Sequence, residues 1–245
     1  MKKVTLNEFL LARVHLGHKA SIWNPKMSPF IYSKISYKVG LKKETDHIID
    51  VIKTKKNLDY AWKILEKAGY ENKKILFIGT KEPAKEVIKK EAQKSKSFYI
   101  NTKWLGGTLT NWSTMGNQVE SIKLLEQKER TGFINSLPKK EGSKMYRKKT
   151  KLLSVLGGLK NMTAIPDIVI IVDSNQEQTA VLECTKLNIP IIALTDTNCN
   201  PELINIPIPA NTCNKVSIGV ILGILSEGIT TGQKKHLPIK YWIEV

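Results

Sequence analysis

Residues 167–175 have the sequence Asp167-Ile-Val-Ile-Ile-Val-Asp-Ser-Asn175, in which five apolar β-branched residues are followed by three polar ones. A short apolar run bounded by turn-forming residues is typical of a strand that is buried on both faces of a parallel sheet. The polar residues that follow it then lie at the carboxyl end of that strand. This stretch predicts a sheet core with polar side chains along one edge.

Similar apolar runs lie on both sides of this stretch, and helical patterns separate them. We expect further strands or extended pieces at 48–52, 75–78, 97–100, 189–194 and 203–208. Helices are expected at 5–13, 54–68, from about residue 83, at 178–187 and at 216–227. The alternation predicts an α/β protein with a doubly wound parallel sheet. Residues 14–47 have no regular pattern, and we expect them to be irregular.

One segment interrupts the alternation. Residues 112–158 contain no strand pattern, and Thr131-Gly132 and Pro138 divide them into two predicted helices. We interpret them as a two-helix hairpin inserted into a core formed by 1–111 and 159–245. The hairpin follows the sequence Lys103-Trp-Leu-Gly-Gly-Thr-Leu-Thr-Asn-Trp112, in which the two glycines permit a tight turn. We expect this segment to fix the angle between the core and the hairpin.

The charge of the chain is strongly positive and unevenly distributed. The formal net charge is +17, and residues 1–160 hold 34 Lys and Arg against 14 Asp and Glu, whereas 161–245 hold 5 against 8. This asymmetry favours a polyanionic partner, most simply nucleic acid, over a membrane surface. Only 3 of the 39 basic residues are Arg, which favours contacts with the phosphate backbone over reading of base edges. A solvated charged face is the alternative for the basic second half of the hairpin.

The cysteines and the apolar segments set further limits. The three cysteines are odd in number and include no Cys-x-x-Cys, so we expect a reducing compartment and no disulfide framework. The first residues lack the apolar core of a signal peptide, and the apolar stretch at 216–225 is too short to span a bilayer. We therefore expect no membrane partner.

Two kinds of chemistry are possible at the polar ends of the strands. A Mg²⁺-dependent or nucleotide-binding enzyme would use Lys81, Asp173 and Asp196, because ligands of open parallel sheets bind at this edge. No Gly-x-Gly-x-x-Gly, Walker or nucleophile-elbow motif accompanies them, so capping of turns and helices is the favoured interpretation. His18, Asp196 and Cys213 are weaker candidates for a structural metal ion, provided that the N-terminal segment covers this edge.

Several segments together resemble the bacterial and organellar small-subunit ribosomal protein S2 family. They occur in the family's order and extend over nearly the whole chain. They are Gly17-His18, Trp23-Asn-Pro-Lys-Met27, Pro29-Phe-Ile-Tyr32, Ile75-Leu-Phe-Ile-Gly-Thr-Lys81, Asn101-Thr-Lys-Trp-Leu-Gly-Gly-Thr-Leu-Thr-Asn111, Leu156-Gly-Gly-Leu-Lys160, Pro166-Asp167, Ile189-Pro190, Asp196-Thr-Asn198 and Ile208-Pro-Ala-Asn211.

The resemblance implies a flavodoxin-like core with a coiled-coil hairpin, and a structural, non-catalytic role in binding rRNA at the junction of the head and body of the small subunit. It also implies neighbouring small-subunit proteins as partners, including the large mRNA-binding one where that protein is present. The chain departs from the family at Asn211-Thr212-Cys213, where Asn-Asp-Asp is frequent, so a metal or docking site that uses those acids is in doubt. The Lys-, Ile- and Asn-rich composition suggests a plastid ribosome, with the bacterial cytoplasm or the mitochondrial matrix as alternatives.

Lysine and aromatic side chains are suited to phosphate contact and to base stacking, respectively. We expect the N-terminal segment, 1–47, to face RNA, together with the hairpin entrance and the basic second helix of the hairpin. The predicted RNA contacts are Trp23, Lys26, Tyr32, Lys34, Lys103, Trp104, Lys144, Arg147, Lys148 and Lys149.

Overall fold

A five-stranded parallel sheet forms the centre of the computed structural model, which describes residues 5–39 and 42–236. The strand order is β5-β4-β6-β7-β8, which corresponds to the order 2-1-3-4-5 of a flavodoxin-like sheet. The predicted fold class is confirmed. The five strands are β4 (Ile75–Ile78), β5 (Phe98–Ile100), β6 (Ile168–Val172), β7 (Ile191–Thr195) and β8 (Ile206–Pro209).

Helices cover both faces of this sheet. Successive side chains of a strand point to opposite faces, so each strand contributes to two buried clusters. Phe77, Ile170 and Leu194 contribute to one buried cluster, and Ile78, Ile171 and Ala193 contribute to the other. The first face is covered by α1 (Leu6–Leu11), α2 (Val51–Tyr70), α3 (Glu82–Lys94) and α8 (Lys215–His236). The second is covered by α7 (Gln178–Lys186) and by the base of the helical hairpin.

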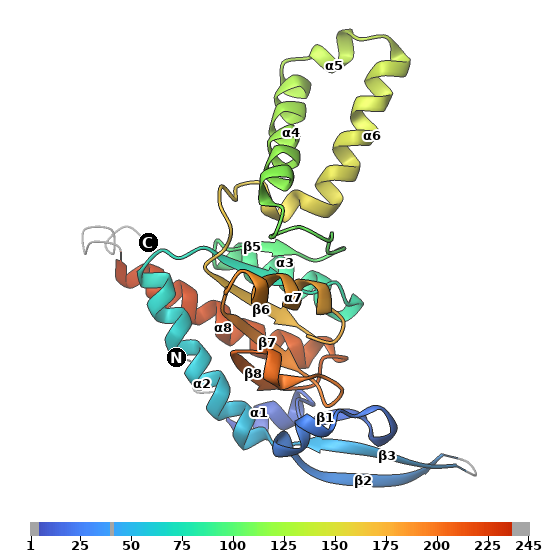
Figure 1. The fold of residues 1–245 in the computed structure, drawn as a ribbon, viewed down its shortest axis with the longest axis vertical. Coiled ribbons are helices and arrows are strands. Elements are labelled where there is room, and N and C mark those ends of the chain that lie inside the picture. Colours follow the sequence, from blue (N-terminus) through green and yellow to red (C-terminus); the bar gives the residue numbers. More distant parts are fainter. Residues whose placement is uncertain (1–4, 40–41, 237–245) are drawn as a thin grey trace.

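The hairpin consists of α4 (Trp112–Arg130), the short α5 (Phe133–Ser136) and α6 (Lys139–Leu156). Figure 1 shows it projecting away from the sheet. Met115, Val119 and Ile122 of α4 join the second core cluster with Leu152 and Leu156 of α6, so apolar packing anchors the base of the hairpin. Coiled-coil packing along its length and its status as a separate domain remain predictions.

The expectation that residues 14–47 are irregular is wrong. They form β1 (Leu16–Lys19), two 3-10 turns, η1 (Ala20–Ile22) and η2 (Pro25–Phe30), and β2 (Ile31–Val39), and the second sheet is completed by β3 (Lys42–Ile49). These strands pair in the antiparallel order β1-β3-β2. The β2–β3 ribbon extends from the end of the molecule opposite the hairpin (Figure 1). The expected strand at 48–52 is displaced: β3 ends at Ile49, and Asp50 accepts hydrogen bonds from the Ile52 and Lys53 amides as the N-cap of α2.

The remaining described elements are two 3-10 turns, η3 (Gly157–Leu159) and η4 (Pro201–Leu203). The closing helix α8 extends nine residues beyond the expected end at 227. Among the described helices, α8 is long and apolar enough to cross a membrane by length and composition, but 56% of its apolar window is buried in the protein. Its contacts with α2 and α3 make it a core helix.

Close packing of α2 against α8 depends on glycine. A Cβ atom at Gly232 would lie 1.9 Å from the Glu66 carbonyl oxygen, and one at Gly69 would lie 2.3 Å from the Ile229 carbonyl oxygen. Backbone atoms at these distances cannot move aside as a side chain can. By contrast, a Cβ atom at Gly223, on the same helix, would have no atom within 4 Å outside its own helical surroundings.

These two glycines of α8 give a matched pair of substitutions. We expect Gly232→Ala to lower the free energy of unfolding by about 1–3 kcal/mol, because the added methyl group separates the two helices. Gly223→Ala should raise it by up to about 1 kcal/mol, because alanine has the higher helix propensity. Chemical denaturation measures both; equal effects of the two substitutions would contradict the packing described here.

Candidate functional site

The carboxyl edge of the parallel sheet is occupied by the protein's own charged side chains. Lys81 follows β4 and Asp173 follows β6, and the Lys81 Nζ atom lies 2.8 Å from Asp173 Oδ2. The Thr212 hydroxyl donates to the same carboxylate oxygen, and the amides of Asn175 and Gln176 donate to the other. Burial alone would raise the pKa of Asp173, but Lys81 and these donors lower it. Asp173 is therefore a buried, fully bonded carboxylate.

The topological switch point of the sheet, where the strand order changes direction, lies between β4 and β6. Open sheets of this kind bind phosphate-bearing ligands at this point. Here Glu177 fills that position, because its Oε1 atom accepts hydrogen bonds of 2.7 Å from both the amide and the hydroxyl of Thr80. Burial raises the pKa of Glu177. The side chains of Lys81, Asp173 and Glu177 are thus bonded to other groups of the protein at this edge, beside a pocket that Thr80, Trp104 and Glu177 help to line.

The N-terminal segment crosses the same edge at β7. His18 and Asn24 donate their backbone amides to Thr197 Oγ1 and to the Thr197 carbonyl, at 3.0 and 2.8 Å. Gly17 is required there, since a Cβ atom would lie 2.6 Å from the Thr197 methyl carbon. The N-terminal segment therefore covers this edge of the sheet, as the prediction of a metal site at His18, Asp196 and Cys213 requires.

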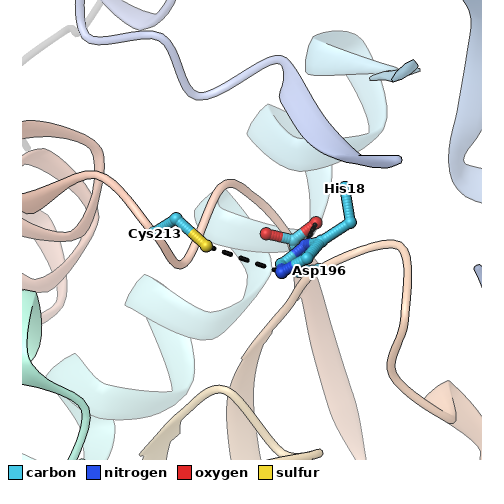
Figure 2. Close-up of side chains that lie close together, drawn as sticks. All are labelled: His18, Asp196 and Cys213. Atoms are coloured by element: carbon cyan, nitrogen blue, oxygen red, sulfur yellow. Dashed lines mark hydrogen bonds and ion pairs between the residues drawn. The ribbon is translucent and has the colours of Figure 1, made fainter. Parts of the chain in front are cut away.

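Figure 2 shows His18, Asp196 and Cys213 together. His18 Nδ1 lies 2.8 Å from Asp196 Oδ1, and His18 Nε2 lies 3.5 Å from Cys213 Sγ. The hydrogen bond with Asp196, followed by that with Cys213, raises the pKa of His18 to about 10 despite its burial. The His18 hydrogen bond and the nearby Lys81 lower the pKa of Cys213, whereas burial raises that of Cys199 to about 12.

This geometry suits a metal ion only in part. Nε2 of His18 and Sγ of Cys213 are placed to share one ion, with Asp196 orienting the imidazole from behind, as in many zinc sites. A closed structural zinc site has four protein ligands, however, and the ligand atoms that these three residues bring within 4.8 Å of one another do not complete such a set. Lys81 Nζ, 3.3 Å from Cys213 Sγ, also places positive charge there. A metal at this cluster remains a prediction.

The hairpin entrance is organised by Glu183, a residue of α7 that the sequence analysis did not single out. Its carboxylate accepts hydrogen bonds from the Trp104 indole, from the backbone amides of Gly107, Leu109 and Thr110, and from the Thr110 hydroxyl, at 2.8–3.2 Å. Burial would raise the pKa of Glu183, but these donors lower it. An acidic residue on the otherwise apolar face of the helix at 178–187 is the sequence signal that could have indicated this role.

The predicted RNA contacts near this entrance differ in availability. Trp104 is part-buried and committed to Glu183, so it acts as a packing residue of the loop. Lys103 is exposed. The Gly107 backbone has a φ of +83°, which confirms that the Gly-Gly pair supplies a turn here.

The second helix of the hairpin presents a basic stripe, defined as Lys140, Lys144, Arg147, Lys148 and Lys151 of α6. The spacing of these residues places them on one helical face, and all five are exposed. Within the described part of the chain none of them forms an ion pair. Lys149, by contrast, faces α4 and pairs with Glu129, so it serves packing of the hairpin.

The predicted RNA-contact residues of the N-terminal segment also differ in how exposed they are and in whether they have partners within the protein. Tyr32 is 76% exposed, and Lys34 of the same strand, β2, is also exposed. Trp23 lies between Lys34 and the buried His47: its ring centroid is 5.1 Å from that of His47, and Lys34 Nζ lies 5.4 Å from the Trp23 ring centroid. Lys26 is exposed and pairs with Glu202. The Trp23 ring therefore packs against His47 and Lys34 in this structure.

A flavodoxin-like parallel sheet, with a projecting helical hairpin that has a basic stripe, is the architecture of this protein. A family model described as ribosomal protein S2 matches residues 9–232, so the chain belongs to the ribosomal protein S2 family. The chain is a structural component of the small ribosomal subunit in translation, and it is not an enzyme.

Individual relatives agree. The chain is 48% identical over 236 residues to the small ribosomal subunit protein uS2c of Emiliania huxleyi, covering 96% of this chain and all of that one. It is 48% identical to the uS2c protein of Cyanophora paradoxa, with coverage of 95% and 96%, and 45% identical to the uS2 protein of Nostoc punctiforme, with coverage of 97% and 87%. The algal relatives are plastid-encoded, and the location of this chain is the plastid ribosome.

The Glu183 contacts predict a stability that depends on pH. Glu183→Gln should lower the free energy of unfolding at neutral pH by about 2–3 kcal/mol, because an amide cannot accept all the hydrogen bonds of a buried carboxylate. Since the folded pKa is lowered, this contribution is present above the ordinary value of 4.5 and is lost as the pH falls through the folded pKa. The difference between the two proteins should therefore shrink in acid.

The control is Glu202→Gln, which removes an exposed ion pair with Lys26. It should change stability by less than about 1 kcal/mol. Denaturant titrations from neutral to acidic pH measure all three proteins. A difference for Glu183→Gln that is the same at every pH would rule out the carboxylate as the cause.

The metal prediction has a spectroscopic test. Titration of the protein with Co²⁺ should give thiolate-to-cobalt absorption from Cys213, and Cys213→Ser should remove it. Cys199→Ser is the control, because Cys199 is buried beside Asp173 and away from the His18 imidazole. Absence of the absorption in the unchanged protein would exclude a metal site at this cluster.

Proposed function

We propose that this protein binds small-subunit rRNA and neighbouring ribosomal proteins at the junction of the head and body. The observation that carries the proposal is the basic stripe on α6, whose five side chains are exposed and without ion-pair partners in the described structure. Unpaired cations aligned on a projecting helix are suited to the regularly spaced phosphates of RNA. Lys is abundant and Arg is rare, which agrees with contacts to the backbone.

A second surface supports RNA binding from the other end of the molecule. Tyr32 and Lys34 are exposed on the β2–β3 ribbon, where Lys34 pairs across the strands with His47. Because the ribbon and the hairpin lie at opposite ends of the core (Figure 1), one molecule spans two separate segments of its partner. This arrangement supports a role at a junction.

Protein neighbours complete the proposal. The large mRNA-binding protein of the small subunit is a proposed partner where it is present. A candidate contact surface lies along α8 and α1, where Leu11 and Val216 are 83% and 59% exposed beside Gly219 and Gly223. This apolar face differs in chemistry from the basic stripe, so the two suit different partners.

The basic stripe predicts a steep salt dependence. If about six phosphates are contacted, the logarithm of the affinity for small-subunit rRNA should fall against the logarithm of salt with a slope near −5. Lys144, Arg147 and Lys148 changed together to Glu should reduce that slope by about 2–3 and weaken incorporation into subunits. Filter binding and sedimentation of assembled particles measure these effects.

The matched control changes Lys56, Lys63 and Lys90 to Glu, which alters the net charge equally at exposed positions of α2 and α3. It should leave most of the salt slope and the incorporation in place. Equal losses in the two triple variants would assign the binding to overall charge, and a flat salt response of the unchanged protein would contradict RNA binding.

A further inference from the structure

The β2–β3 ribbon has a free strand edge. Within the described chain the order of this sheet is β1-β3-β2, so β2 pairs with β3 on one side and with no strand on the other. All residues from 32 to 38 are exposed. An unpaired edge presents backbone N–H and C=O groups in alternation, and a further strand can pair with them. The outer edge of β2 is therefore a long and accessible site for backbone pairing.

The two faces of the ribbon differ in charge. The register between β2 and β3 is regular from residue 34 onward, so alternate residues of β2 lie on the same face there. One face carries Lys34, Ser36 and Lys38, and the hydrogen bond of 2.9 Å between the hydroxyls of Ser36 and Thr45 belongs to it. Among the described side chains this face has no carboxylate.

The opposite face, called the acidic ribbon face below, consists of Ile35, Tyr37, Glu44 and Asp46. Ile35 pairs with Asp46 and Tyr37 with Glu44 across the two strands. The Tyr37 hydroxyl donates to Asp46 Oδ2 at 2.8 Å, which agrees with their position on one face. Lys19 of β1 lies 2.8 Å from Glu44 Oε1. The described side chains here thus leave one negative charge in excess, in a chain of net charge +17.

The acidic ribbon face also exposes large apolar side chains beside the free edge. Ile35 is 52% exposed and Tyr37 is 40% exposed. A long strand edge with exposed apolar side chains promotes unwanted pairing unless something covers it. These observations indicate a surface that is covered in the assembled particle.

We propose that the free edge of β2 pairs with an extended segment of a neighbouring small-subunit protein that has Lys or Arg at alternate positions. The backbone of this segment adds a strand to the sheet. Its basic side chains lay their aliphatic stems on Ile35 and Tyr37, and their charged ends reach Glu44 and Asp46 across the strand spacing of about 4.8 Å. The inference rests on the proposed contact with neighbouring ribosomal proteins and gives that contact a surface and a partner chemistry.

Two other occupants fit this edge less well. RNA brings negatively charged phosphates to a face that carries carboxylates, and phosphate oxygens only accept hydrogen bonds, whereas a strand edge both donates and accepts. A second copy of this chain that paired through the same edge would gather Lys34 and Lys38 of both copies on one face, where like charges repel.

The test is photo-crosslinking in plastid small subunits assembled with the full-length protein. Benzophenone maleimide is attached at Ile35→Cys in a chain that carries Cys213→Ser, in which the other two cysteines are buried. Irradiation should join Ile35→Cys to a protein, and mass spectrometry should find alternate Lys or Arg in the joined segment. Ser36→Cys, the next residue on the opposite face, is the control and should give at least about tenfold less of this product.

A pair of charge reversals tests the acidic ribbon face. Glu44→Lys, combined with the Ile35→Cys label, should lower the yield of the protein crosslink by about fivefold or more, because it repels a basic segment. Glu86→Lys is the matched control, since Glu86 is also paired with a lysine, Lys215, but lies on α3. It should leave the yield unchanged. Thermal unfolding and incorporation into subunits confirm that each variant is folded.

Hydrogen exchange measures the backbone pairing. Amides of residues 32–38 should exchange more slowly in assembled subunits than in the free protein, because an added strand accepts hydrogen bonds from the outer edge of β2. Exchange that is equally fast in both would exclude strand addition.

Four crosslinking results would overturn the proposal. They are crosslinks from Ile35→Cys to rRNA, crosslinks to a second copy of this chain, no crosslink in fully assembled subunits, and a protein crosslink that Glu44→Lys leaves unchanged. None of them alters the salt dependence of rRNA binding by the unchanged protein. A failure of the proposed RNA binding would be seen in that salt dependence instead.

Discussion

The carboxylate of Glu183 determines how the hairpin leaves the core. It lies on α7, within the layer that covers the sheet, and it collects the donors of a loop that precedes α4 by only a few residues. The direction of the projecting hairpin therefore depends on this buried, negatively charged group together with the apolar packing at the base of the hairpin. The basic stripe on the hairpin and the β2–β3 ribbon lie at opposite ends of the core, and their separation is fixed only if this joint is rigid.

Charged side chains at the carboxyl edge of the sheet are also paired with other side chains of the protein. In an enzyme with this fold, polar side chains at the carboxyl ends of the strands are left free for a ligand. Here Lys81 pairs with Asp173, Glu177 accepts hydrogen bonds from Thr80, and His18 of the N-terminal segment pairs with Asp196. The edge has become an attachment point for the N-terminal segment. The ion pairs at this edge stabilise the fold. The exposed cations of the basic stripe lie on the hairpin instead.

The sequence was sufficient for the parts of the fold that depend on local pattern. All five parallel strands, the interruption at 112–158 and the meeting of His18, Asp196 and Cys213 could be predicted. The β2–β3 ribbon could not, because its long solvent-exposed strands lack a clear apolar alternation. The contacts of Trp104 and Lys149 could not be predicted from the sequence pattern either. Each depends on a partner distant in sequence, Glu183 for Trp104 and Glu129 for Lys149.

The exposed face of α6 is proposed to lie on small-subunit rRNA. The most direct measurement is hydroxyl-radical cleavage from an iron chelate attached at Ser143→Cys, an exposed position one turn before Arg147, in a chain that carries Cys213→Ser. In plastid small subunits assembled with this protein, we expect cleavage of the rRNA backbone at a small set of neighbouring positions. Fully incorporated protein that produces no rRNA cleavage would contradict it.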